Sequence, residues 1–148
     1  MDQRLWERAA AAIAAAQAGE TDAEQRLREC WSACNPHEHA LRCIIAHHLA
    51  DLQQDPVDEL EWDQRALEAH DEVTDEDLGA FGIRSKQAFL PSLHLNLGDD
   101  WLRVGDRVLA HEHLRRAQSA AGHLGDDRYG EMIRRGLHGL ADRLAQAG

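Results

Sequence analysis

LNLGDDWLRVGDRVLAHEHLRRA, residues 95–117, is the stretch that decides the fold. Apolar and small residues recur in it at spacings of three and four, which is the period of an amphipathic helix. Gly105-Asp106 interrupts this pattern and turns the chain, because glycine breaks a helix and permits a tight corner. The stretch therefore predicts two helices joined as a hairpin.

Similar punctuation divides the rest of the 148-residue chain. Ala and Leu dominate its apolar residues, while β-branched and aromatic residues are scarce, which favours helices over strands. Asp22, Asp55 and Thr74 stand where N-caps are needed. We therefore predict one all-α domain of about seven helices. The ranges are residues 1–19, 22–35, 38–53, 56–72, 85–104 with a bend at Pro91, 106–121 and 127–146, with a short additional helix after Thr74.

The hairpin at residues 95–117 resembles the tetratricopeptide repeat. In that family a small residue lets two helices approach, an aromatic residue fills the gap between them, and a glycine forms the corner. The second helix then presents a small residue, a larger apolar residue and another small one. These places are taken by Gly98, Trp101, Gly105, Ala110, Leu114 and Ala117, and the closing proline of the family is missing near Gly122.

The resemblance implies a right-handed array of antiparallel helical hairpins, because one repeat cannot bury its own apolar face. The array would comprise a best repeat at 91–121, a degenerate repeat at 38–72, an insertion at 74–90 and a capping helix at 127–146. We expect Gly98 and Ala110 to touch across the best hairpin. The residues expected to point inward include Val108, Leu109, Leu114 and Ala117 from 106–121, and Met132, Ile133, Leu137, Leu140 and Leu144 from 127–146.

What the family does implies a scaffold for recognition. In such arrays the first helix of each hairpin lines a concave groove, which receives an extended peptide or a helix of a partner protein. The carboxamide of Asn96 suits this role because it can both donate to and accept from a ligand backbone. The resemblance thus implies a non-catalytic adaptor or regulatory protein. Its groove would be lined by His47, Asp51, Ser92, Leu95, Asn96, Asp99 and Arg103.

The formal charge of −11 is concentrated in one segment of the chain. Residues 51–77 hold twelve acidic residues and only Arg65 as a base, so the rest of the sequence sums to zero. A negative field repels phosphate, so we expect neither direct nucleic-acid binding nor adsorption to an anionic membrane, whereas a basic protein or peptide partner is favoured. The alternative is a solvated acidic face that has no partner.

Targeting signals are not evident. The apolar run at residues 9–16 is mostly alanine, with charges of both signs before it and no convincing cleavage site after it, which does not match a signal peptide. No uninterrupted apolar stretch reaches membrane-spanning length. The three cysteines, an odd number, fit reduced thiols better than a disulfide framework. We therefore expect a cytoplasmic protein.

The densest cluster of potential ligands suggests an alternative function, a metal-binding or thiol-responsive protein. Two cysteines lie one helical turn apart, and a four-residue ladder follows on the next predicted helix, a spacing that can direct ligands to one side. Against this, no Cys-x-x-Cys knuckle is present, and free cysteines are often small core residues. The candidate ligands are Cys30, Cys34, His39, Cys43 and His47.

Catalytic signatures are absent from the sequence. No nucleophile elbow, phosphate loop, dinucleotide fingerprint or His-Glu-x-x-His pattern occurs, so we expect neither an enzyme nor a cofactor, although catalytic groups can assemble from distant positions. His94 is expected to be a packed, hydrogen-bonded histidine. Leu5, Trp6, Ile13 and a band of alanines on the first helix suggest a two-fold homodimer. The alternative is that the first two helices pack inward as an ordinary hairpin.

Overall fold

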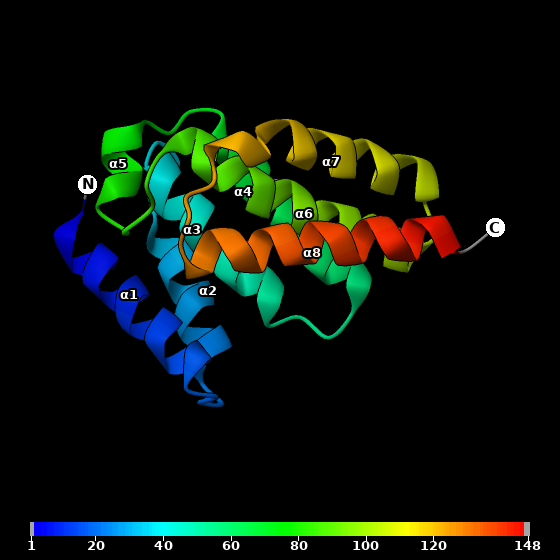
Figure 1. Ribbon diagram of the computed structural model, residues 1–148. Helices are drawn as coiled ribbons and strands as arrows, with labels where there is room; N and C mark the ends of the chain where they lie inside the picture. The colour runs from blue at the N-terminus through cyan, green and yellow to red at the C-terminus, as the bar shows by residue number, and fades with distance from the viewer. Residues whose placement is uncertain (1, 147–148) are drawn as a thin grey trace. The chain divides into compact units, whose positions relative to one another are not determined.

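The computed structural model describes residues 2–146, and this part of the chain contains eight α-helices, one short 3₁₀ helix and no strand (Figure 1). The all-α prediction is confirmed. Contacts within the chain divide it into two compact units, unit 1 (Met1–Val73) and unit 2 (Thr74–Gly148). No helix among the described residues is long and apolar enough to cross a membrane.

Unit 1 consists of four helices in two antiparallel pairs. These are α1 (Gln3–Gln17), α2 (Ala23–Ala33), α3 (His39–Asp51) and α4 (Pro56–His70). The most extensive contact joins α3 to α4, followed by α1 to α2, and α2 also packs against α3. The Asp55 carboxylate accepts a hydrogen bond from the Val57 amide at 2.8 Å and so caps α4, as predicted, with Pro56 in the first turn.

The interior of unit 1 is formed mainly by α3. Eight of its thirteen residues are buried, on several faces of the helix. A helix that is apolar on several sides must be covered on several sides to remove that surface from water. The buried residues of α3 are Ala40, Leu41, Cys43, Ile44, Ile45, Ala46, Leu49 and Ala50.

Unit 2 is a three-helix assembly preceded by a short helix. Its elements are α5 (Asp75–Gly79), α6 (Lys86–Val104), α7 (Arg107–Ala120), the 3₁₀ turn η1 (Ala121–His123) and α8 (Arg128–Gln146). The long helices α6 and α7 form the hairpin, and α8 packs on both (Figure 1). Thr74 and Ser85 cap α5 and α6 through side-chain hydrogen bonds to the Asp77 and Ala88 amides.

The α6–α7 corner forms as the sequence pattern predicts. Gly105 ends α6 in the left-handed conformation, with φ of 97°, which glycine adopts without steric cost. The Asp106 carboxylate then accepts a hydrogen bond from the Leu109 amide at 3.0 Å. Within the hairpin, a Cβ on Gly98 would lie 3.4 Å from the Ala110 carbonyl oxygen. The predicted meeting of Gly98 and Ala110 is therefore confirmed.

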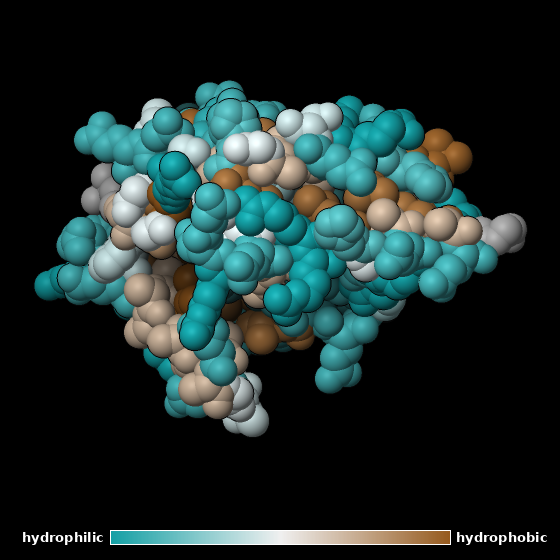
Figure 2. Space-filling model, in the orientation of Figure 1, coloured by the Kyte–Doolittle hydropathy of each residue, from teal (hydrophilic) through white to brown (hydrophobic). Residues whose placement is uncertain are grey.

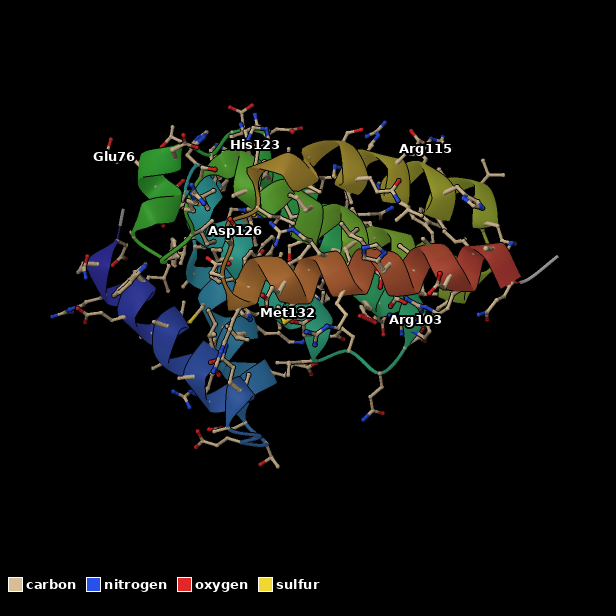
Figure 3. The ribbon with its side chains drawn as sticks, viewed as in Figure 1. Glu76, Arg103, Arg115, His123, Asp126 and Met132 are labelled. Atoms are coloured by element: carbon tan, nitrogen blue, oxygen red, sulfur yellow. The ribbon has the colours of Figure 1, made fainter. Side chains whose placement is uncertain are left out.

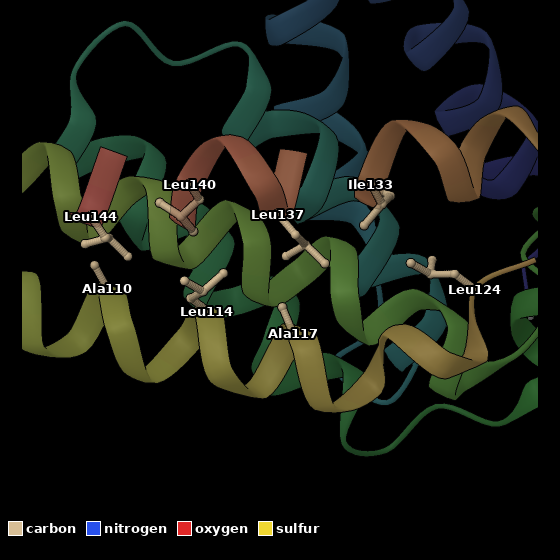
Figure 4. Close-up of a cluster of buried hydrophobic side chains, with 8 residues drawn as sticks. All are labelled: Ala110, Leu114, Ala117, Leu124, Ile133, Leu137, Leu140 and Leu144. Atoms are coloured by element: carbon tan, nitrogen blue, oxygen red, sulfur yellow. The ribbon is translucent and has the colours of Figure 1, made fainter. Parts of the chain in front are cut away.

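A single apolar cluster joins α7 to α8 (Figure 4). Its side chains recur at spacings of three and four on both helices, so each helix turns one stripe toward the other. Figure 4 shows the α8 leucines above the small residues Ala110 and Ala117. The cluster consists of Ala110, Leu114, Ala117, Leu124, Ile133, Leu137, Leu140 and Leu144.

Two predictions of inward-facing side chains were wrong. Val108 is 78% exposed and Met132 is 56% exposed, because each lies beside the buried stripe of its helix and not in it. Asp22 is the N-cap residue of α2, as predicted, but its side chain makes no capping hydrogen bond and instead approaches Arg26 at 3.9 Å. Pro91 is almost fully buried inside α6, and the bend expected there stays a prediction.

Candidate functional site

Three of the predicted groove residues on α6 contact α8. A Cβ on Gly136 would lie 2.6 Å from Cδ2 of Leu95, so this leucine packs directly against the α8 backbone. The Asp99 carboxylate accepts a hydrogen bond from Nη1 of Arg143 at 2.6 Å. Ser92 is buried and hydrogen-bonds to the side chain of Tyr129. These three side chains therefore already have partners within unit 2.

The remaining two α6 positions lie at the margin of this contact. Arg103 is exposed and pairs with Asp99 at 3.1 Å and with Asp100 at 3.0 Å. Asn96 is half-buried. The face of α6 that the repeat resemblance assigns to a ligand is thus largely occupied by α8.

The two groove residues of unit 1 lie near the end of α3. His47 is half-buried, and burial lowers the pKa of its imidazole to about 4. Its neighbour His48 also has its pKa lowered to about 4, by burial first and by the proximity of His47 second. Asp51 is exposed. Both histidines are therefore neutral at pH 7, so they offer hydrogen bonds and no positive charge to a ligand.

The cysteines of the alternative metal site are free and buried. Burial raises the pKa of the Cys43 thiol to about 12, and burial together with the Glu38 carboxylate raises that of Cys34 to about 12. Metals bind the thiolate, so these shifts oppose binding. No three of the five candidate ligands bring their ligand atoms within 4.8 Å of one another in residues 2–146. These five residues thus form no preformed ligand set among the described residues, and the metal site stays a prediction.

A pocket in unit 1 was not anticipated from the sequence. It has a volume of about 390 Å³ and lies where α2 ends, α3 begins and α4 ends. Trp31 and Arg42 form part of its wall, and Arg65 and Glu68 contribute from α4. Its lining therefore combines an aromatic ring with charges of both signs. The full lining is Trp31, Pro36, His39, Arg42, Arg65, Glu68, Ala69, Asp71 and Glu72.

A second pocket, on α6, α7 and η1 of unit 2, has a volume of about 650 Å³ and opens widely to solvent. Arg115 and His123, labelled in Figure 3, lie on its wall. His94 also lines it, is buried, and places its Nδ1 atom 3.0 Å from that of His113. This contact confirms the prediction that His94 is a packed, hydrogen-bonded histidine.

Figure 2 shows a mainly hydrophilic surface, with hydrophobic side chains visible between α7 and α8. Ala121, Leu137 and Ala141 line a shallow pocket of about 310 Å³ in that region. Figure 2 also shows moderately hydrophobic side chains along α1. On α1 the residues Leu5, Ala9, Ala12 and Ala15 are buried, so the apolar stripe of this helix faces inward.

Comparisons with protein-family models, with curated proteins and with solved structures find no match to this chain. The resemblance to the tetratricopeptide repeat therefore depends on the residues of the hairpin itself.

Proposed function

We propose that this chain is a non-catalytic protein-interaction module, built from stacked tetratricopeptide-like hairpins, that binds a peptide or a helix of a partner protein. The packing at Gly98 supports this proposal most directly. Gly98 lies against the Ala110 backbone and the Leu140 side chain, and Gly105 makes the corner. These residues have the same roles in the hairpin as the small and corner residues of the repeat.

The charge distribution supports a basic partner. Unit 1 contains sixteen acidic residues and six basic ones, whereas unit 2 is nearly balanced, with eleven and ten. A surface of this kind accelerates association with a basic protein and disfavours nucleic acid. We place the module in the cytoplasm, where its three free thiols would stay reduced. The two-fold homodimer stays a separate prediction, because the apolar stripe of α1 that suggested it faces inward.

The proposal can be tested by selecting ligands from a random peptide library displayed on phage, with the full chain immobilised. A binding module should enrich related sequences, and the synthetic peptides should bind with micromolar or better affinity. Matched groove variants, Asn96→Ala and Asp51→Asn, then show whether the predicted groove takes part. A library that yields no enriched sequence and no measurable peptide affinity would contradict the proposed function.

A further inference from the structure

Two arginines of unit 1 lie on tryptophan rings beside the 390 Å³ pocket. The guanidinium carbon of Arg42 is 3.8 Å from the centroid of Trp31, and that of Arg65 is 4.4 Å from the centroid of Trp62. The two indoles meet edge to face, with centroids 5.1 Å apart and an interplanar angle of 90°. The four side chains come from α2, α3 and α4, so the packing of these helices holds both guanidinium groups in place.

Neither guanidinium group forms an ion pair with another side chain within residues 2–146, although carboxylates stand at helical spacing from both. Glu61 and Glu68 lie four residues before and three residues after Arg65, and Glu38 lies four residues before Arg42. On α2, by contrast, Arg26 approaches Asp22, four positions earlier, at 3.9 Å.

A guanidinium group has five N–H donors, and contact with an aromatic ring does not use all of them. These donors match the two oxygens of a carboxylate, and such charge-assisted bonds are among the strongest hydrogen bonds in proteins. Arg42 and Arg65 therefore supply carboxylate donors at the pocket wall, and their contacts with Trp31 and Trp62 position the guanidinium groups before any ligand arrives.

The same pocket also carries negative charge. Glu68, Asp71 and Glu72 contribute to its lining, within a segment whose formal charge is −11. A ligand that brought only a carboxylate would be opposed by this field. A ligand that also brought a nearby cation would satisfy both sets of charges.

We propose that this pocket binds a short segment of a partner chain that presents a carboxylate and, within a few residues, a lysine or arginine. The carboxylate lies against Arg42 and Arg65, and the cation faces Glu68 and Glu72. This inference rests on the proposed function and identifies the ligand chemistry. None of the seven predicted groove residues lines this pocket, so the two sites are separable by mutation.

The direct test is a titration of the full chain with acetyl-Lys-Gly-Glu-amide, followed through the arginine Nε–Hε resonances by NMR. Two further peptides identify the source of the carboxylate. Acetyl-Lys-Gly-Gln-amide has no carboxylate, and acetyl-Lys-Gly-Gly with a free C-terminus has its carboxylate at the end of the chain. We expect saturable shifts at Arg42 and Arg65 with a carboxylate peptide, and affinity about tenfold lower without one.

Variants complete the test, with circular dichroism to check folding. Arg42→Gln and Arg65→Gln should each weaken binding about tenfold, whereas Arg26→Gln, on an arginine of the same unit that does not line the pocket, should leave it unchanged. The double variant Glu68→Gln, Glu72→Gln should weaken the binding of acetyl-Lys-Gly-Glu-amide, because it removes the carboxylates that face the lysine. If Arg42→Gln impairs folding, the resonance shifts at Arg42 and Arg65 in the unaltered chain still decide the matter.

The inference is overturned if no carboxylate peptide saturates these shifts below about 10 mM, or if the glutamine peptide binds equally well. Phage-selected peptides whose affinity survives both arginine substitutions would also overturn it, while leaving the proposed binding function intact. A phage library without enriched sequences would overturn the proposed binding function. The tripeptide titration would still show separately whether the pocket binds a carboxylate peptide.

Discussion

The helices of unit 1 and unit 2 pack through different kinds of side chain. In unit 2, glycines let helices approach closely, as Gly98 does beside Leu140 and Gly136 does beside Leu95. In unit 1, helix α3 is buried on several faces, and the rings of Trp31 and Trp62 contact the guanidinium groups of Arg42 and Arg65. Close approach of backbones needs small residues, whereas large aromatic rings fill wider gaps.

The comparison shows that the part of the chain most similar to the repeat need not be the part with an open polar pocket. Unit 2 contains the best match to the repeat, yet α8 occupies most of the α6 face where the family binds its ligands. Unit 1 matches the repeat poorly, yet it has a pocket lined by Arg42 and Arg65 and carries most of the negative charge. Recognition is therefore expected in unit 1 rather than on α6.

The largest expected effect tests the packing of unit 2. A Cβ on Gly98 would lie 2.7 Å from Cδ2 of Leu140, so Gly98→Leu must push α8 or α7 away. We expect the free energy of unfolding to fall by about 2 kcal/mol or more through overpacking. Urea denaturation measures this change.

Gly139→Ala is the matched control for this helix contact. No atom lies within 4 Å of a Cβ at that position, so alanine there should be neutral or raise the free energy of unfolding by up to about 1 kcal/mol through its higher helix propensity. An unchanged stability of Gly98→Leu would count strongly against the close approach in unit 2.

The next largest effect is the pH dependence of stability that the buried His48 imidazole gives to unit 1. The pKa of His48 is lowered to about 4, below its usual value of 6.5, so the fold favours the neutral imidazole. Its contribution to stability is fully present above pH 6.5 and is lost as pH falls from 6.5 toward 4.

Urea unfolding at pH 7 and pH 5 can measure this contribution. Between pH 7 and pH 5, the free energy of unfolding should fall by on the order of 1–2 kcal/mol more in the wild type than in His48→Gln. The variant lacks the imidazole that the unfolded chain protonates. Equal losses in both proteins would show that His48 is not buried in its neutral form.

Helix capping gives a smaller contrast between the units. The Asp106 side chain accepts a hydrogen bond from the Leu109 amide, whereas Asp22 makes no such bond at the start of α2. Asp106→Ala should therefore lower the free energy of unfolding by about 1 kcal/mol, and Asp22→Ala by about 0.5 kcal/mol or less. Thermal melts of both variants decide this, and equal destabilisation would contradict the assignment.

The smallest effect probes the polar contact between α6 and α8. Asp99 and Arg143 are partly exposed, so their ion pair should contribute about 0.5 kcal/mol. A double-mutant cycle with Asp99→Asn and Arg143→Gln measures the coupling, which should shrink as salt rises. A coupling of zero at low salt would argue that the two side chains do not meet.

The sequence predicted the helices well because their ends depend on local chemistry. Asp55-Pro56, Thr74 and Gly105 act within one or two turns of their own positions, so their effects can be read without the tertiary structure. The prediction that Val108 and Met132 point inward was wrong because an apolar side chain need not be buried, and each lies off the buried stripe of its helix.

The candidate site was harder to predict because it depends on how helices cross. Trp31, Arg42 and Arg65 are far apart in the sequence and meet only when α2, α3 and α4 pack. Among the arginine–tryptophan contacts at this pocket, only the one between Trp62 and Arg65 can be expected from the sequence. These two residues lie three positions apart on α4 and are therefore helical neighbours. Likewise, the repeat resemblance placed Leu95 and Asp99 on one face of a helix but could not show that α8 covers that face.

Nuclear Overhauser effects in the free protein test most directly whether α8 occupies the face of α6 that the repeat resemblance assigns to a ligand. With methyl-labelled leucine, we predict a strong contact between the Leu95 methyl groups and the Gly136 α-protons, and another between Leu140 and Gly98. Absence of both contacts, with the α6 and α8 resonances assigned and helical, would contradict the account and leave the α6 face open to a ligand.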